Sequence, residues 1–219
     1  MKKDRRTLLI NSGMELFSRS GFRDVSVDAI SRGCGLSVGS FYKHFSSKEE
    51  FYDVILGVMT HEGIRKARRV MDSLSSPVNK LRVLYQFIIL GVRRYPVLRG
   101  VLTGDPRYLY PGIDVAGGAI GSLRSAVEEM IAETIRDGSR RGIFRPGLYE
   151  NVNGMVLALL ELVISTSAHP DIDVLTRDIL VLLQRGLRRA IRIPRRDELR
   201  DRRILQREES LDPLKWLET

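Results

Sequence analysis

Hydrophobic residues recur along most of this chain with the spacing of α-helices, and no segment alternates convincingly as a β-strand would. We expect a first helix over residues 7–20, closed by Gly21, and a short second helix that Ser26 can cap. Ser37 can cap a third helix from residue 38 to about residue 45. Short helices joined by a tight turn predict a helix-turn-helix at the N-terminus.

A long fourth helix is expected to follow at once. Ser47 and Glu50 have the spacing of a capping box, in which each side chain satisfies the free backbone amide of the other residue. The apolar positions expected to face inward on this helix are Phe51, Val54, Ile55, Val58 and Met59. Pro77 marks the start of the next helix and Pro96 its end. Its expected inward stripe is Leu81, Leu84, Tyr85, Ile88, Val92 and Tyr95.

The second half of the chain is also predicted to be helical. Residues 96–118 are rich in proline and glycine and predict turns with short helical pieces, after which the stripe returns over residues 119–141. Two further helices are expected at about 150–168 and 174–193, and both are apolar over most of their circumference. Such helices need cover on several sides, either in a monomer core or, as we favour, in a dimer interface. The prediction is an all-α fold of about nine helices.

The predicted third helix separates two kinds of side chain. Phe41 and Phe45 are four residues apart and would pin the helix to its neighbours. The side chains expected on the opposite side are Val38, Gly39, Tyr42, Lys43 and His44. Tyr42 and His44 can donate hydrogen bonds to phosphates, and Lys43 adds positive charge. Ser26 and Ser37 can offer hydroxyls and amides at helix N-termini, and Lys48 opens the next helix at the same surface.

These features predict a DNA-binding face, although the same side chains also suit an ordinary surface in which the serines are only caps. The net charge of +9 favours a polyanionic partner. Much of that charge, however, lies in residues 185–196, where a solvated face or salt bridges to the acidic residues of the tail are the simpler explanation. The charge therefore adds little to the DNA-binding interpretation.

The N-terminal residues resemble the signature of the TetR/AcrR family of transcriptional regulators from about residue 8 to residue 55. The resemblance is carried by Phe17, Gly21–Phe22, Ser26–Val27, Ile30, Cys34–Gly35–Leu36–Ser37, Gly39, Phe41–Tyr42–Lys43–His44–Phe45 and Ser47–Lys48–Glu49. It implies an all-helical homodimer with a three-helix DNA-binding head and a larger helical body that binds a ligand. By this resemblance Tyr42, His44 and Lys48 match positions that contact the DNA backbone. The positions nearest the bases are Val38, Gly39, Ser40 and Lys43.

Two residues depart from the family pattern. Val38 stands where a polar or basic residue is frequent, so its contact with a base would be apolar, for example with a thymine methyl group. Cys34 replaces a small alanine in the turn, and we favour a packing role for it over a redox role. A single cysteine also excludes a disulfide within the chain and fits a reducing compartment.

The resemblance also implies a domain organisation and an effector pocket. We expect a helix-turn-helix domain over residues 1–47, an effector-binding and dimerisation domain over 48–194, and a charged tail over 195–219. Apolar residues expected to line the pocket are Phe87, Ile88, Leu102, Tyr108, Tyr110, Ile113, Leu123, Val127, Met130, Leu159 and Val163. Glu161 interrupts this apolar region, and it either faces solvent or a basic residue, as we favour, or pairs with a cationic ligand.

Catalysis, a cofactor and a metal site are not expected. His44, His61 and His169 are far apart in sequence, and no nucleophile and base can be paired. No apolar run approaches the ~20 residues of a membrane span, so we predict a soluble, cytoplasmic protein. The predicted function is a repressor that a small, largely apolar effector releases from a palindromic operator on double-stranded DNA. The alternative is a helical small-molecule-binding or scaffold protein whose head does not bind DNA.

Overall fold

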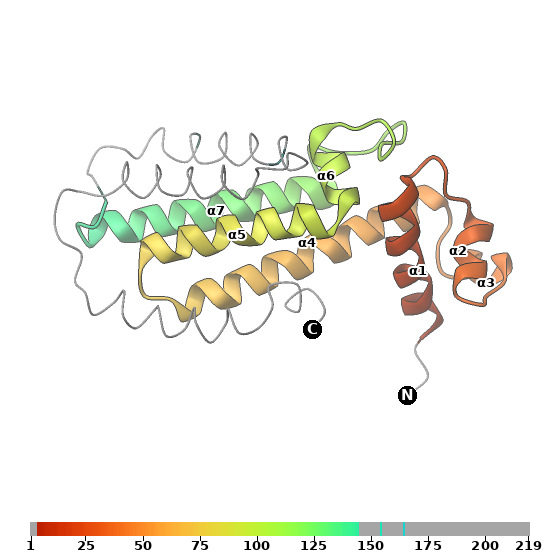
Figure 1. Cartoon of the computed structure of the whole chain (residues 1–219), viewed down its shortest axis with the longest axis horizontal. Coiled ribbons are helices and arrows are strands. Elements are labelled where there is room, and N and C mark those ends of the chain that lie inside the picture. Colours follow the sequence, from red (N-terminus) through yellow and green to blue (C-terminus); the bar gives the residue numbers. More distant parts are fainter. Residues whose placement is uncertain (1–3, 145–153, 155–163, 165–219) are drawn as a thin grey trace. The chain divides into compact units, whose positions relative to one another are not determined.

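The computed structural model describes residues 4–144 together with Gly154 and Ile164 (Figure 1). The helices within these residues are α1 (Arg5–Ser20), α2 (Val27–Gly33), α3 (Val38–Tyr42), α4 (Lys48–Ser73), α5 (Pro77–Arg94), α6 (Pro96–Thr103) and α7 (Gly118–Arg140). The described part of the chain contains no strand, which confirms the all-α prediction. The helices expected at 150–168 and 174–193, and the tail at 195–219, lie outside the described residues.

The chain divides into two compact units. The first contains residues 1–62 and 95–123, and the second contains residues 63–94 and 124–219. Helix α4 contributes its first part to one unit and its last part to the other. The three N-terminal helices thus share a unit with α6, which contacts α1. The predicted domain limits at residues 47 and 194 stay predictions.

Aromatic side chains form the core of the first unit. Phe17 on α1 meets Tyr52 on α4 edge to face, with ring centroids 4.9 Å apart. Phe45 and Phe51 make a similar contact at 4.6 Å. Gly13 allows this close packing, because a Cβ atom there would lie 2.4 Å from the ring of Phe51. The first turns of α4 therefore hold α1 and the α3 region in one core.

Helix caps form largely as the sequence predicts. The hydroxyl oxygens of Ser26, Ser37 and Ser47 accept hydrogen bonds from the amides three residues further on, at 3.0–3.2 Å. The capping box at α4 differs in one respect. The Glu50 carboxylate accepts the amide of Ser46 at 2.7 Å, together with the Ser46 hydroxyl, and so reaches one residue beyond the expected partner.

Two of the expected helix details are wrong. Helix α3 ends at Tyr42 and not near Phe45, although the amide of Phe45 still donates to the carbonyl of Phe41 at 3.1 Å. Val58 on α4 was predicted to face inward, but it is 41% exposed. The buried side of α4 follows Phe51, Ile55 and Met59, and position 58 lies at the edge of that side. Gly21 behaves as predicted, with a φ of 80° at the end of α1.

The second unit contains the end of α4 together with α5 and α7. Arg68 on α4 forms ion pairs with Glu129 and Glu133 on α7. On α5 Ile89 is buried, whereas the neighbouring Ile88, which was predicted to face inward, is only partly buried. No helix in the described part of the chain combines the length and apolar character that a membrane crossing needs.

Candidate DNA-binding surface and effector region

The side chains around α3 divide between core and surface. Phe41 and Phe45 are buried, at 0% and 2% exposure. Tyr42 is 55% exposed and Val38 is 36% exposed, and Gly39, Lys43 and His44 are exposed as well. The Tyr42 ring stands edge to face on Phe41 with centroids 5.3 Å apart, so its hydroxyl is presented from a supported ring. A short, firmly seated helix thus displays a row of polar and small residues.

Ser26 and Ser37 flank this surface at the N-termini of α2 and α3. Both are exposed, and both use their hydroxyl oxygen to accept a backbone amide. A hydroxyl that accepts in this way still has its own proton to donate. Each helix start can therefore offer a hydroxyl and backbone amides to a phosphate group.

Ser40 does not belong to the exposed row. The resemblance put it among the positions nearest the bases, but it is only 7% exposed. Within the described residues its hydroxyl has no hydrogen-bond partner. Position 40 lies on the inward-facing side of α3, so the core covers its side chain. In this conformation the hydroxyl is not accessible to a base edge. The base contact expected for Ser40 stays a prediction, and it would require the side chain to become accessible.

Lys48, predicted to contact the DNA backbone, also makes contacts within the first unit. Its Nζ atom donates to the carbonyl oxygens of Phe22 at 3.0 Å and Val25 at 2.9 Å. It also lies 4.1 Å from the centroid of the Phe22 ring, which favours a cation–π contact. Partial burial lowers the pKa of the Lys48 amine. The amine thus ties α4 to the α1–α2 connection, and a phosphate would have to share it with these carbonyls.

Cys34 packs at the end of α2. Its Sγ atom donates to the carbonyl oxygens of Ser31 at 3.3 Å and Ile30 at 3.5 Å. Burial raises the pKa of the Cys34 thiol, so the reactive thiolate is disfavoured at neutral pH. These contacts support the packing role.

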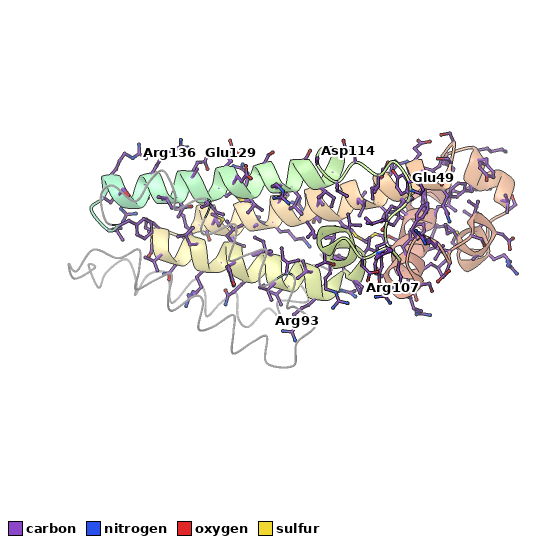
Figure 2. All side chains as sticks on the ribbon, turned by 90° about the horizontal axis from the view of Figure 1, so that it is seen from above. Glu49, Arg93, Arg107, Asp114, Glu129 and Arg136 are labelled. Carbon is purple, nitrogen blue, oxygen red and sulfur yellow. The ribbon has the colours of Figure 1, made fainter. Side chains whose placement is uncertain are left out.

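The connecting segment after α6, residues 105–110, forms hydrogen bonds within the first unit to α4 and to the connection after α1. The amide of Phe22 donates to the carbonyl of Arg107 at 2.8 Å, and a Cβ atom at Gly21 would lie 2.5 Å from that same oxygen. The hydroxyl of Tyr52 donates to the carbonyl of Tyr108 at 2.8 Å. Figure 2 labels Arg107 on this segment. The connecting segment is therefore part of the support of the head.

Two of the residues predicted to line an effector pocket take part in this support. Tyr108 is 5% exposed, and its hydroxyl reaches the carbonyl of Ser18 at 3.4 Å. The hydroxyl of Tyr110 donates to Asp53 at 2.7 Å. Both tyrosines are committed to contacts with α1 and α4, so the structure gives them a supporting role that the apolar pattern did not reveal.

The remaining pocket predictions fall into separate units. Leu102, Ile113 and Leu123 lie partly buried in the first unit. Phe87, Ile88, Val127 and Met130 lie in the second unit. Leu159 and Val163, like Glu161, fall outside the described residues. The predicted set is therefore distributed over both units, and the effector pocket stays a prediction.

The second unit also contains a half-open cavity of about 310 Å³ that sequence reasoning missed. Its lining residues are Arg68, Met71, Asp72, Lys80, Met130, Glu133, Thr134, Asp137 and Arg140. Of the predicted pocket residues that lie in the described part of the chain, only Met130 is among them. A sequence signal for this cavity was present, because the charged residues Glu133, Asp137 and Arg140 are spaced so that they lie on one side of α7. Figure 2 shows neighbouring Glu129 and Arg136 on the same helix.

Metal ligands do not gather in the described part of the chain, where no three His, Cys, Asp or Glu side chains could hold one ion.

Comparison with known proteins gives the same picture of the head. Residues 9–55, which comprise most of α1, all of α2 and α3 and the start of α4, match the family described as bacterial regulatory proteins, tetR family. The transcriptional repressor KstR2 of Mycobacterium tuberculosis is 26% identical over 151 residues, which cover 66% of this chain and 71% of KstR2. The regulator UidR of Escherichia coli is 25% identical over 150 residues, which cover 65% and 70%.

The fold is also shared with solved structures. FadR of Bacillus subtilis, solved with stearoyl-CoA, superposes with a TM-score of 0.69 at 15% identity, over 84% of this chain and all of that one. KstR2 of Mycobacterium tuberculosis gives a TM-score of 0.60 at 22% identity, over 86% and 97% of the two chains. The fold and the exposed α3 surface define a helix-turn-helix, DNA-binding transcriptional regulator. Residues 9–55 carry the N-terminal domain of the tetR family.

Proposed function

We propose that this protein is a homodimeric repressor that binds a palindromic operator through α3 and is released from it by a small, largely apolar effector. The observation that carries the DNA-binding part is the division of side chains around α3, where Phe41 and Phe45 are buried and Tyr42, Lys43 and His44 are exposed. A DNA-binding role requires access to the chromosome, which supports the predicted cytoplasmic location.

Contacts with DNA would fall into two groups. Tyr42, His44 and the N-termini of α2 and α3 suit phosphates, which fix the orientation of the protein without reading sequence. Lys43 and Val38 lie on the exposed side of α3 and suit base edges, Val38 through an apolar contact. Because Ser40 is buried and Gly39 has no side chain, few side chains remain for direct reading. DNA shape would then supply part of the specificity.

Dimerisation fits the symmetry of a palindromic operator. Two heads related by a twofold axis would occupy major grooves about one helical turn apart or somewhat more. The helices that we expect to form the interface, at about 150–168 and 174–193, lie outside the described residues. Native mass spectrometry of the purified protein tests this proposal directly, because a mass of one chain at micromolar concentration would contradict it.

Release by an effector requires that the body and the head be coupled. Residues 95–123 share one compact unit with the three N-terminal helices, and the contacts of Tyr52 with Tyr108 and of Phe22 with Arg107 join them. A ligand that favours another arrangement of this segment would shift the head and lower DNA affinity, with a coupling free energy of about 1–3 kcal/mol. One structural neighbour, FadR of Bacillus subtilis, was solved with stearoyl-CoA, whose long acyl chain is apolar, and this supports an effector with a large apolar part.

A gel-shift experiment tests the proposed function. The full chain is titrated onto a duplex from upstream of its own gene and onto a shuffled duplex of equal length, with and without stearoyl-CoA. We expect selective binding of the upstream duplex, and release by the acyl thioester if the effector resembles that of FadR. Equal, weak binding of both duplexes would contradict the operator proposal and favour a ligand-binding or scaffold protein with an inactive head.

A further inference from the structure

Helix α5 carries one stripe of covered side chains. Positions 78, 82, 85, 89 and 92 follow the helical repeat along one side of this helix. Val78, Tyr85, Ile89 and Val92 are each at most 4% exposed. Arg82, which is only partly buried, stands in the middle of this stripe. An arginine in such a row is unusual unless an acceptor or an anion pairs with it.

Two donors on this stripe lack a hydrogen-bond partner among the described residues. They are the Nε atom of Arg82 and the hydroxyl of Tyr85, and both atoms are buried from solvent. The two residues are three positions apart, so their side chains emerge on the same side of α5 about one turn apart. Buried polar groups in folded proteins almost always have a partner. Two unpartnered donors so close together indicate a place where an acceptor binds.

The chemistry of the two groups specifies that acceptor. Arginine has only N–H donors and keeps its charge, so it presents a fixed positive charge. Burial raises the pKa of Tyr85, so its phenol keeps the proton and also donates at neutral pH. A guanidinium and a phenol converge best on an anionic oxygen group such as a carboxylate or a phosphate. The covered apolar side chains of Val78, Ile89 and Val92 on the same stripe give the two donors apolar surroundings, in which an amphiphilic anion is favoured over a fully hydrated one.

We propose that Arg82 and Tyr85 bind the anionic headgroup of the effector, and that this effector is an amphiphilic acid with a carboxylate or phosphate head and a hydrocarbon chain. This inference rests on the proposed function, because it names the chemical class of the ligand that the body recognises. Neither residue is among those that the apolar pattern suggested for the pocket. The acid is held by its head at Arg82 and Tyr85, and its hydrocarbon chain suits the apolar surroundings of these two donors.

The test compares ligands that differ only in the headgroup. Octanoate, dodecanoate and hexadecanoate are titrated against the primary amides of equal chain length, and dodecyl phosphate is added as a second anion. Calorimetry on the full-length protein measures each dissociation constant. We expect at least one anion to bind about tenfold more tightly than its amide. The relative affinity of dodecanoate and dodecyl phosphate then shows which anion the site prefers.

Variants locate the headgroup. Arg82→Met should remove the preference for the acid over the amide, and Tyr85→Phe should weaken acid binding several-fold. Arg82→Lys retains the positive charge and should keep part of the preference for the acid. This variant separates loss of the charge from a general loss of folding in Arg82→Met. Arg93→Met is the matched control, because Arg93 is an exposed arginine on the same helix, labelled in Figure 2, and should bind the acid as the wild type does.

Three outcomes would overturn the inference. They are equal affinity of acid and amide for the wild type, no binding of any chain length, and an acid preference that survives in Arg82→Met. DNA binding to the upstream duplex is measured on the same preparations, with and without dodecanoate. Acid binding through Arg82 without any operator binding would contradict the proposed function alone. Operator binding without an Arg82-dependent acid preference would contradict this inference alone.

Discussion

The Lys48 side chain supports the candidate DNA-binding surface from within the first unit. Its amine is bonded to the carbonyls of Phe22 and Val25, immediately before Ser26 and the N-terminus of α2. Removal of the amine would leave both oxygens without this donor and free the α1–α2 connection. The side chain thus acts on the DNA-binding surface through the position of α2.

The first prediction compares Lys48→Met with Lys43→Met. Lys48→Met should lower the free energy of unfolding by about 1–2 kcal/mol, because hydrogen bonds from a charged donor are lost. Lys43 is exposed and assigned to base edges, so Lys43→Met should leave stability unchanged but weaken binding of the upstream duplex by about tenfold. Thermal unfolding and salt-dependent anisotropy measure the two effects. If Lys48→Met has unchanged stability and its DNA affinity depends less on salt, Lys48 contacts a phosphate directly.

The second prediction concerns the carboxylate that caps α4. Hydrogen bonds from the hydroxyl and the amide of Ser46 lower the pKa of Glu50. A carboxyl group whose pKa is lower in the folded state stabilises the fold above its unfolded pKa, and this stabilisation is lost as the pH falls through the folded pKa. Glu50→Ala should therefore be less stable than the wild type at pH 7, and the difference should shrink as the pH falls below about 4.

Glu49→Ala is the control for that measurement. Glu49 is also exposed in the first turn of α4, so it shares the favourable position near the helix N-terminus. We expect a smaller loss of stability in Glu49→Ala than in Glu50→Ala at pH 7, as measured by urea unfolding. A loss in Glu50→Ala that is equally large at pH 7 and pH 3 would show that the charge of Glu50 is not the cause.

At the scale of elements, the segment after α6 joins regions that are distant in sequence. The hydrogen bond from Tyr52 to the carbonyl of Tyr108 spans 56 residues, and that from Tyr108 to Ser18 spans 90. The Tyr52 side chain is fully buried. This segment is therefore both a structural support of the head and the connection through which we expect an effector signal to reach it.

The third prediction tests that connection with Tyr52→Phe. Loss of the hydroxyl leaves the Tyr108 carbonyl without its donor and should destabilise the protein by about 1–2 kcal/mol. Because the α3 surface is untouched, operator affinity without effector should change less than about threefold, while the effector should release DNA less efficiently. Tyr110→Phe is the comparison, since its bond to Asp53 is exposed and should matter less to stability. Normal effector release in a Tyr52→Phe protein of reduced stability would exclude this connection as the route.

Local signals in the sequence predicted the elements better than their assembly. Caps at Ser26, Ser37 and Ser47 and the spacing of Phe41 and Phe45 depend on neighbouring residues, so they could be deduced. The burial of Ser40 could not, because it depends on how α3 seats against the core. The internal bonds of Lys48 and the support from Tyr108 join residues more than 20 positions apart, which periodicity does not reveal.

For the molecule as a whole, the proposed repression requires two heads of this chain to bind one operator through α3. A phosphate-contacting surface requires an affinity that falls with salt, and a twofold site requires two chains per duplex. Tyr42 is the most useful reporter, because it is 55% exposed and its ring rests on Phe41. Its removal should affect binding while leaving the core of the first unit in place.

The most direct test is the anisotropy of a labelled upstream duplex titrated with wild-type protein, Tyr42→Ala and Tyr42→Phe at several salt concentrations. We expect two chains per duplex, wild-type affinity at least ~10³-fold above that for shuffled DNA, and about tenfold weaker binding by Tyr42→Ala. Tyr42→Phe should lie between them. Identical affinity of the wild type and Tyr42→Ala for the upstream duplex, with no preference over shuffled DNA, would contradict the assignment of α3 as the operator-reading helix.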